Sequence, residues 1–403
     1  MQTQLTEAAR RSAGGQRAEQ ILRACVHCGF CNATCPTYQL LGDELDGPRG
    51  RIYLIKQVLE GTPPTARTLQ HLDRCLTCRN CETTCPSGVR YGQLVEIGRA
   101  TVEQQVPRPW LDRLQRRAFR LVLPYRARFA PLLRVGQLAR PLLPAPLREA
   151  VPERRTALGT WPTAAHPRKV VLLEGCVQPA LRPNINQATA QVLDRLGIEA
   201  VRIPAAGCCG AVSLHLNAHD EAEVQMRRNI DAWWPALEAG AEAIVANASA
   251  CGLQLKEYGD LLRNDPAYAA KAARISALTR DIAELVAAAD LTRLRTARAR
   301  RLVFHPPCTL QHGQRIKGVV EAILQQTGHT LLPFNETHLC CGSAGTYSLL
   351  QPALSNQLRS RKLGHLLRPA PELIASANIG CLEHLAAKTD VPVVHWIELL
   401  AER

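Results

Sequence analysis

One cysteine pattern occurs twice near the start of the chain, and this repeat constrains the fold more than any other feature. Cys25-x2-Cys28-x2-Cys31-x3-Cys35-Pro36 returns fifty positions later as Cys75-x2-Cys78-x2-Cys81-x3-Cys85-Pro86. Three cysteines at two-residue intervals can turn their thiolates inward from one tight loop and hold three irons of a cubane cluster. The proline after each fourth cysteine discourages continuation of a helix. We therefore expect iron–sulfur clusters in this region.

The fourth cysteine of each motif is expected to cross over, because in two-cluster ferredoxins it binds the cluster of the other motif. Two [4Fe-4S] clusters are predicted, with Cys25, Cys28, Cys31 and Cys85 as ligands of the first and Cys75, Cys78, Cys81 and Cys35 as ligands of the second. A pair of zinc knuckles is the alternative, since Cys-x2-Cys is also a zinc spacing. Zinc explains neither the third cysteine of each motif nor the prolines, so clusters are favoured.

The cysteine count also bears on the compartment. Sixteen cysteines in 403 residues would suggest disulfides in a secreted protein. The first sixteen residues are polar, however, and lack the apolar segment of a signal peptide. We expect the reducing cytoplasm, where cysteines serve as metal ligands or redox groups. No run reaches the roughly 18 apolar residues of a membrane span, so any membrane contact is expected to be peripheral.

Short helices are predicted between the two motifs. Ile52 and Ile55 lie on one face of a helical pattern, and a second short helix around Leu69 and Leu72 leads into the second motif. Two cluster loops separated by helices favour an alpha-helical ferredoxin domain over the compact, strand-rich type. This domain is predicted over residues 1–105.

A basic linker is predicted over residues 106–167. Twelve arginines and three acidic residues between positions 106 and 155 give this stretch +9 of the total charge of +14. One helical side is apolar and the next is basic, formed by Leu111, Leu114, Ala118 and Leu121, and by Arg113, Arg116, Arg117 and Arg120. We expect the apolar side to pack on the protein and the arginines to face solvent. Docking onto anionic lipid or an acidic subunit is the alternative. PLLPAP (141–146) is predicted to be a spacer.

A second internal repeat fills the rest of the chain. Its first copy is an apolar strand ending in Cys176, then Cys208-Cys209-Gly210 after 31 intervening residues, then the strand AIVANASA ending at Cys251. About 132 residues later the same order returns, with Cys308, Cys340-Cys341-Gly342 and LIASANIG ending at Cys381. Helical patterns lie between the strands. Two tandem α/β cysteine-rich units are predicted, over residues 168–298 and 299–403, and the fold class is α+β overall.

The cysteines of each unit are predicted to converge, because the strands of one parallel sheet present their ends along a common edge. The two expected sites are Cys176, Cys208, Cys209 and Cys251, and Cys308, Cys340, Cys341 and Cys381. Adjacent cysteines seldom form a disulfide with each other, and the glycine that follows permits close backbone approach. A metal or iron–sulfur centre in at least one unit is favoured. A thiol/disulfide couple and a vestigial structural role stay open.

Other candidate residues are less informative. His305 lies three residues before Cys308 and could orient a ligand, but a histidine beside a strand is more often a structural residue with satisfied hydrogen bonds. Trp233 and Trp234 are expected to pack a helix. The chain has no GxGxxG after a strand and no Walker loop, so no nucleotide or flavin site is predicted. No residue is predicted to be catalytic.

With both repeats taken together, the sequence resembles the iron–sulfur subunits of bacterial glycolate oxidase over nearly its whole length. The resemblance rests on RACVHCGFCNATCPTYQLLGDELDGPRGRIYLIKQVLEG (23–61), HLDRCLTCRNCETTCPSGVRYG (71–92), LEGCVQP (173–179), AGCCGAV (206–212), HLCCGSAGTY (338–347) and ANIGC (377–381). The two cysteine motifs are shared more widely, with subunits of lactate dehydrogenases, anaerobic glycerol-3-phosphate dehydrogenase and heterodisulfide reductases. The long connecting stretches point to the glycolate family.

The resemblance implies an electron-transfer subunit with two [4Fe-4S] clusters. A partner FAD subunit of the vanillyl-alcohol-oxidase type would oxidise glycolate to glyoxylate, so the substrate site would lie on that partner chain. The complex would contain two flavoprotein-like subunits beside this chain, would pass electrons to a quinone or other acceptor, and would lie peripherally at the inner face of the cytoplasmic membrane. Where heterodisulfide reductases have a further cysteine, this chain has Ala248 and Asn378, which argues against the five-cysteine noncubane cluster of that enzyme.

Alternatives remain at the level of substrate and of protein class. D-lactate carries one methyl group more than glycolate and is the second substrate candidate, followed by glycerol-3-phosphate or a heterodisulfide-reductase-type complex. The +14 charge is also compatible with a nucleic-acid-binding protein that has a structural cluster. That class gives no reason for two complete cluster motifs or for the duplicated Cys-Cys-Gly units. We therefore expect no nucleic-acid partner.

Overall fold

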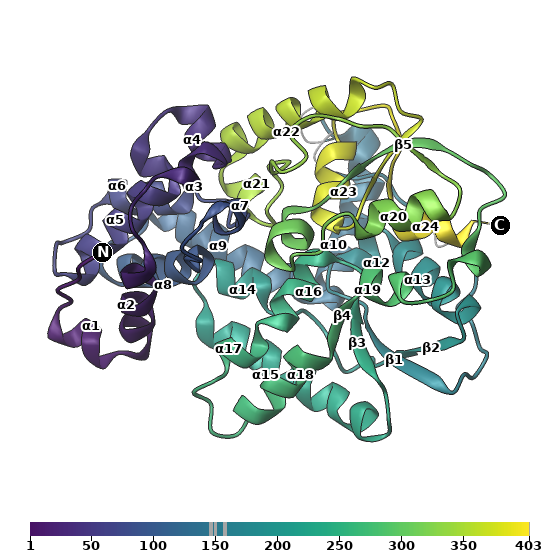
Figure 1. Cartoon of the computed structure of the whole chain (residues 1–403), viewed down its shortest axis with the longest axis horizontal. Helices are drawn as coiled ribbons and strands as arrows, with labels where there is room; N and C mark the ends of the chain where they lie inside the picture. Colours follow the sequence, from purple (N-terminus) through teal and green to yellow (C-terminus); the bar gives the residue numbers. More distant parts are fainter. Residues whose placement is uncertain (145–147, 149–150, 156–158, 403) are drawn as a thin grey trace.

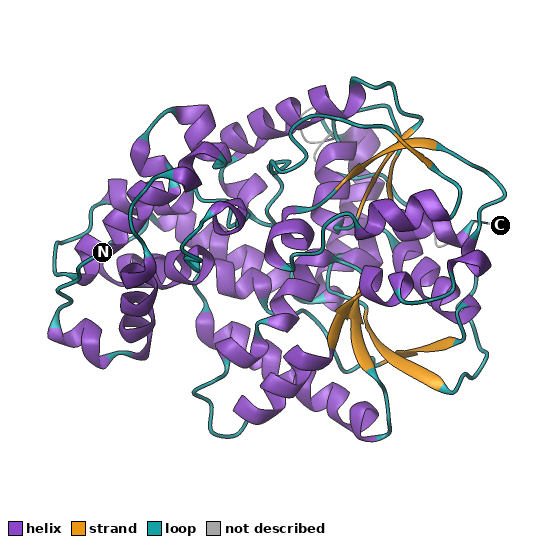
Figure 2. Cartoon of the chain, in the orientation of Figure 1, coloured by secondary structure: helices purple, strands orange, loops and turns teal. Residues whose placement is uncertain are grey.

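A helical N-terminal part precedes two β-sheets in the computed structural model, which describes residues 1–144, 148, 151–155 and 159–402 (Figure 1). Figure 2 shows the strands gathered into two separate sheets, with helices around them. The mixed helix and sheet class predicted from the sequence is confirmed. Ala145 and Pro146, at the end of the expected spacer, lie outside the described residues.

The N-terminal part is built from short helices packed around one apolar core. These are α1 (Glu7–Arg11), α2 (Ala13–Ala24), α3 (Phe30–Ala33), α4 (Pro36–Leu41), α5 (Pro48–Leu59), α6 (Ala66–Asp73), α7 (Asn80–Thr84) and α8 (Tyr91–Gln105). Leu22, Ile55, Leu72 and Leu94 are fully buried in this core. Proline starts α5, where its fixed φ suits the first helical turn, and a capping box of Thr65 and Thr68 starts α6. Both helices predicted between the cysteine motifs are therefore present.

The two cysteine-rich units have the same topology. Their sheets run in the orders β2-β1-β3-β4 and β6-β5-β7-β8, and all neighbouring strands are parallel. The strands are β1 (Arg168–Leu173), β2 (Ile198–Arg202), β3 (Ala243–Ala246), β4 (Thr279–Asp281), β5 (Arg301–His305), β6 (Thr330–Leu331), β7 (Leu373–Ser376) and β8 (Val393–His395). This shared order agrees with an internal duplication.

Helices cover the sheets on both faces. In the first unit they are α12 (Gln178–Leu181), α13 (Pro183–Arg195), α14 (Ala211–His215), α15 (His219–Glu238), α16 (Ser249–Lys256), α17 (Tyr258–Leu261), α18 (Ala269–Leu278) and α19 (Ile282–Ala287). In the second they are α20 (Val319–Gln326), α21 (Tyr347–Leu350), α22 (Pro352–Leu367), α23 (Ile379–Ala386) and α24 (Trp396–Ala401). Val170 faces the core shared by the two units, and Val171 faces the core that contains the first unit's cysteines. Such burial on both faces is typical of parallel sheets and explains their continuous apolar strands.

The strands end earlier than the sequence predicted. β1 ends at Leu173, three residues before Cys176, and β3 ends at Ala246, so that Cys251 lies in the first turn of α16. Cys381 likewise lies in the first turn of α23. The chain leaves the sheet at its carboxyl edge and turns into a helix, so the cysteines lie just outside the sheet. The prediction that the strands continue to the cysteines was wrong.

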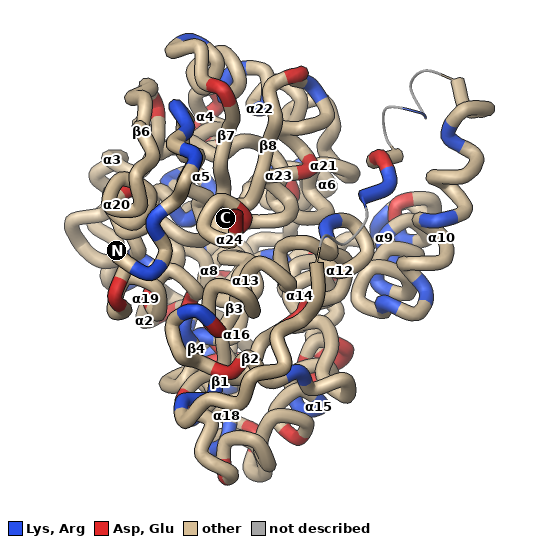
Figure 3. Tube along the Cα trace, turned by 90° about the vertical axis from the view of Figure 1, so that its right-hand side faces the viewer, with Lys and Arg blue, Asp and Glu red and all other residues tan. Residues whose placement is uncertain are grey.

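The basic linker forms, among its described residues, the helices α9 (Trp110–Val122) and α10 (Arg126–Ala139), and Figure 3 shows the Lys and Arg positions along them in blue. The orientation of α9 differs from the prediction. The apolar side is exposed, with Leu111 60% and Leu114 57% accessible. On the basic side, Arg116 is buried against the protein and pairs with Asp73 and Asp112. Paired carboxylates explain this reversal, because they compensate the buried guanidinium. Among the described residues, no helix is both long and apolar enough to cross a membrane.

Candidate metal centres

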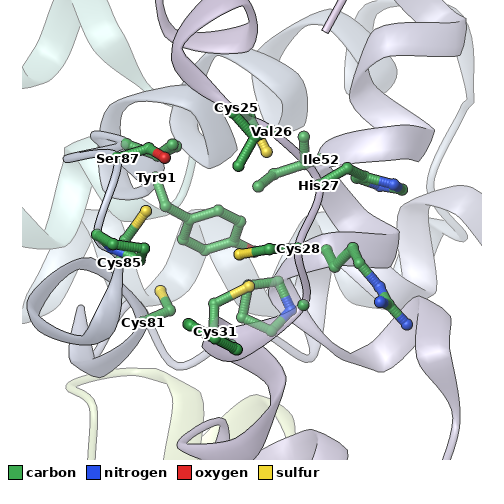
Figure 4. A pocket seen from close by; sticks show the side chains of 16 residues that line it. Cys25, Val26, His27, Cys28, Cys31, Ile52, Cys81, Cys85, Ser87 and Tyr91 are labelled. Carbon is green, nitrogen blue, oxygen red and sulfur yellow. The ribbon is translucent and has the colours of Figure 1, made fainter.

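The first predicted ligand set surrounds one cavity of the N-terminal part. Cys25, Cys28, Cys31 and Cys85 all line it, together with the ring of Tyr91 (Figure 4). Two short segments bring these cysteines together, namely the loop before α3 with the first turn of α3, and the end of α7. The cross-over cysteine therefore lies beside the three cysteines of the other motif.

The second predicted set gathers around Cys81, which lies in α7. The thiol of Cys81 interacts with those of Cys78, Cys75 and Cys35. Cys81 also lines the first cavity, so the two sets lie close to each other. Cys35 lies at the start of α4, where Pro36 opens the helix, so this proline starts a helix as well as ending the preceding turn.

Burial makes these thiols hard to ionise without a metal. It raises the pKa of Cys31 to about 11, and raises the pKa of Cys25 and Cys35 above the ordinary thiol value. It raises the pKa of Cys81 well above that value. Thiolates are the form that binds metal, so a cluster would supply the positive charge that stabilises them here. The donor set, four cysteines around each centre, fits a [4Fe-4S] cluster.

A buried arginine adds positive charge beside the second set. Arg51 is 1% exposed; its Nε donates to the His71 carbonyl at 2.7 Å, and its guanidinium donates to Thr37 Oγ1 at 3.2 Å. Thr37 Oγ1 in turn lies 3.3 Å from Cys35 Sγ. Asp46, also buried, pairs with Arg51 at 3.4 Å. Arg51 therefore ties α5 and α6 to the cysteine at the start of α4.

The first cysteine-rich unit brings its four predicted cysteines together. Cys176 contacts Cys208, and Cys209 contacts Cys251. Hydrogen bonds from Cys176 and Cys209 lower the pKa of Cys208 well below the ordinary value, because they stabilise its thiolate. Gly210 follows with a φ of +93°, which places the turn in a conformation that favours glycine.

The second unit repeats this arrangement with one added group. Cys308 contacts Cys340, and Cys341 contacts Cys381. His305, at the end of β5, has a ligand atom within 4.8 Å of the sulfurs of Cys341 and Cys381. Burial lowers the pKa of His305 well below the ordinary histidine value, which favours the neutral imidazole.

His305 was predicted to be a structural residue with satisfied hydrogen bonds, and that prediction was wrong. Neither ring nitrogen has a hydrogen-bond partner among the described residues, although the side chain is fully buried. Asn378 occupies the position of the additional cysteine of heterodisulfide reductases, and its Nδ2 donates to Cys381 Sγ at 3.7 Å. Gly342 has a φ of +93°, and a Cβ there would lie 2.5 Å from the carbonyl oxygen of Ser355.

The second cluster loop docks directly onto the second cysteine-rich unit. Cys78 and Leu76 pack in one apolar group with Cys308 and Cys340, and the Cys308 thiol interacts with Cys78. Asn80 Nδ2 donates to the His338 carbonyl at 3.2 Å across the same interface. The second ligand set is therefore in contact with the cysteines of that unit.

Arg51 and Lys362 were not identified from the sequence. Both are buried, and Lys362 lies near Cys308 and Cys341. Arg51 carried no signal of its own in a single sequence. Lys362 carried none either, because the offset between the two units changes from 132 residues at Cys208 and Cys340 to 130 residues at Cys251 and Cys381, and Lys362 lies between these positions.

Comparison with known proteins defines the class. Residues 21–89 match the family described as 4Fe-4S dicluster domain, and residues 170–256 and 302–386 match the family described as cysteine-rich domain. The chain is thus an iron–sulfur protein with two cysteine-rich domains.

Individual relatives identify the family within this class. The glycolate oxidase iron-sulfur subunit of Escherichia coli (strain K12) is 56% identical over 402 residues, which cover 100% of this chain and 99% of that protein. A probable glycolate oxidase iron-sulfur subunit of Bacillus subtilis (strain 168) is 30% identical and covers 94% of this chain and 93% of its own length. Lactate utilization protein A of Geobacillus kaustophilus is 28% identical but covers only 58% of this chain. The chain belongs to the family of glycolate oxidase iron–sulfur subunits.

Proposed function

We propose that the chain is the electron-transfer subunit of a glycolate oxidase complex that converts glycolate to glyoxylate. Its role is to receive electrons from a partner that carries FAD and the substrate site. Full-length similarity to a glycolate oxidase subunit supports this proposal over a role with D-lactate, because the lactate utilization relative covers only 58% of the chain. The sequence also lacks a GxGxxG or Walker motif that would bind a nucleotide or flavin.

The chain's own contribution is two [4Fe-4S] clusters, the first held by Cys25, Cys28, Cys31 and Cys85 and the second by Cys75, Cys78, Cys81 and Cys35. The match to a dicluster domain and the gathering of each set support this assignment. The clusters would supply one-electron carriers at these positions. The protein holds the thiolates, excludes water from the buried set and adds the charge of Arg51. Residues 1–105 form this ferredoxin domain, and the linker (106–167) and the cysteine-rich domains (168–298 and 299–403) follow it.

The observation that carries the proposal is the arrangement of the cysteines in series. Cys28 is exposed at the surface, beside Val26 and Phe30, which are 68% and 62% accessible. Cys78, from the other set, contacts Cys308 of the second cysteine-rich unit. We assign the first ligand set, which contains the exposed Cys28, as the point where electrons enter from the flavoprotein. The cysteine-rich units, with a further iron–sulfur centre, form the exit towards a quinone or other acceptor.

The partners and location follow from the same assignment. Two flavoprotein-like subunits complete the complex, which lies on the cytoplasmic side, peripherally at the inner face of the membrane. The exposed apolar side of α9 supports a docking role for the linker, because Leu111 and Leu114 are more than half accessible. Exposed arginines such as Arg113 and Arg117 beside them favour an anionic lipid surface.

A complementation experiment tests the function. Membranes from a strain that makes the partner subunits without this chain should show no glycolate-dependent quinone reduction. Wild-type chain should restore the rate, and a Cys78→Ala chain should not, although the complex assembles. D-lactate supplied at equal concentration is the substrate control. Glycolate-dependent reduction that persists at the wild-type rate without the chain would show that the proposal is wrong.

A further inference from the structure

The two cysteine-rich units share their cysteines but differ at a buried position beside them. The second unit has His305 where the first, by the 132-residue offset that relates Cys308 to Cys176, has Leu173. Both side chains are nearly or fully buried. A leucine in one copy and an imidazole in the other means that the two sites have diverged in chemistry.

His305 is placed as a metal ligand would be. A ring nitrogen and the sulfurs of Cys341 and Cys381 lie within 4.8 Å of one another, and all three residues are buried. Neither ring nitrogen has a hydrogen-bond partner among the described residues. Leaving a buried polar atom unpaired is unfavourable, because the atom loses its hydrogen bonds to water. Coordination to a metal satisfies such a nitrogen.

A second buried histidine shows that an unpaired ring alone does not make a site. His329 also lacks hydrogen-bond partners among the described residues, but its charged neighbours are Glu402 and Arg300 rather than thiols. What distinguishes His305 is the pair of sulfurs beside it. His329 therefore serves as a matched control.

Two thiolates and an imidazole suit iron or zinc. The contact between Cys308 and Cys78 favours iron, because it places this site next to the second cluster's ligands. Lys362 adds a positive charge near Cys308, Cys340 and Cys341. Such a charge offsets the negative charge of several thiolates around one centre.

We propose that the second cysteine-rich unit holds an iron–sulfur centre with His305 as a ligand beside Cys341 and Cys381. The first unit, with Leu173 at that position, has no such ligand. Histidine in place of cysteine raises the reduction potential of an iron–sulfur centre. The centre would therefore favour receiving electrons from the cluster at Cys78. This inference rests on the proposed electron-transfer function and adds a ligand and a direction to it.

The test uses the full chain, purified anaerobically with ¹⁵N-labelled histidine. Pulsed EPR of the reduced protein should show coupling to a histidine nitrogen. The coupling should be lost in His305→Leu, which copies the first unit, and retained in His329→Leu. Iron analysis should show a loss of iron in His305→Leu and none in His329→Leu.

His305→Cys keeps a ligand at the site and guards against a folding defect in His305→Leu. The His305→Cys chain should retain the iron and lose the nitrogen coupling. The midpoint potential of the iron–sulfur centre in the second cysteine-rich unit should shift downwards. Absence of nitrogen coupling in the wild type, its survival in His305→Cys, or zinc in place of iron in this unit would overturn the proposal.

The same samples separate this inference from the proposed function. Normal signals from the two N-terminal clusters, without iron in the second cysteine-rich unit, would reject the role of His305 and leave the electron-transfer function standing. Absence of the two N-terminal cluster signals from the wild-type chain would reject the proposed electron-transfer function.

Discussion

Cys35 and Cys85 are the residues that join the two cluster loops. Each follows a loop of three cysteines in sequence but lies with the three cysteines of the other loop: Cys85 lines the first cavity, and Cys35 interacts with Cys81 and Cys78. In the proposed assignment, exchange of the fourth ligand would make each cluster depend on both motifs. The two loops are therefore expected to fold and to load iron together.

Paired alanine variants test this exchange by iron content. Cys28→Ala and Cys85→Ala should each lose one cluster, about four irons, and the double variant should lose no more, because both residues serve the same cluster. Cys28→Ala with Cys35→Ala should lose about eight irons. The measurement is iron per chain after anaerobic reconstitution. The reverse pattern, with Cys28 and Cys35 non-additive, would assign each fourth cysteine to its own motif.

The gathering of the N-terminal cysteines could be predicted from the sequence, because short spacing keeps the three thiols of each loop close together, while their assignment as cluster ligands stays a prediction. Arg51 and His305 could not be predicted, because their importance comes from contacts with residues far away in the sequence. Arg51 reaches the carbonyl of His71 at 2.7 Å. His305 was expected to have satisfied hydrogen bonds, and only the packed structure shows that it has none among the described residues.

Helix α7 is the element that connects the ferredoxin part to both cysteine-rich units. Arg79, at its start, forms a two-pronged ion pair with Glu257 of the first unit, with Nη2 to Oε2 at 2.8 Å. Thr83 Oγ1 lies 2.9 Å from His312 Nδ1 of the second unit. A five-residue helix thus positions the second cluster loop against Cys308.

Breaking the Arg79 ion pair should weaken this docking. Arg79→Met leaves Glu257 without its buried partner, and such losses cost about 3–5 kcal/mol. The double variant Arg79→Met with Glu257→Leu should recover most of the lost stability, since an apolar pair can replace a buried ion pair at little cost. Urea unfolding of the iron-loaded chain measures the free energy of unfolding of both variants. Equal destabilisation of the single and double variants would mean that the ion pair contributes nothing specific.

Helix α9 shows what the helical spacing of residues can and cannot predict. The 3.6-residue spacing predicted the helix and its two sides, and the helix is present from Trp110 to Val122. The expectation that the apolar side packs on the protein was wrong, because Arg116 is buried against Asp73, from α6, and pairs with it. Leu111 and Leu114 are exposed, together with Arg113 and Arg117 of the basic side.

Vesicle binding tests the exposed side of α9. The full chain should bind vesicles that contain anionic lipid, and binding should weaken as salt increases. Leu111→Gln with Leu114→Gln should reduce the bound fraction several-fold, because about 25 cal/mol per Å² of apolar burial is lost. Leu349→Gln, at another exposed leucine (52% accessible), is the control. Unchanged binding of the double variant would exclude this surface.

At the scale of the whole molecule, the chain is a helical cluster domain docked on a duplicated pair of α/β units. The 132-residue period predicted the duplication, because the same cysteine order requires the same strand order, and both sheets have it. The docking could not be predicted. It depends on scattered contacts such as Asn80 with the His338 carbonyl and Cys78 with Cys308, which no local pattern encodes.

Iron and sulfide analysis with EPR of the anaerobically purified chain tests the central claim most directly. Two N-terminal [4Fe-4S] clusters require at least about eight irons and eight sulfides per chain, and the reduced protein should show two cluster signals. Cys28→Ala should remove one of these signals and Cys78→Ala the other. About four irons or fewer per wild-type chain, or zinc in place of iron at the eight N-terminal cysteines, would contradict the account.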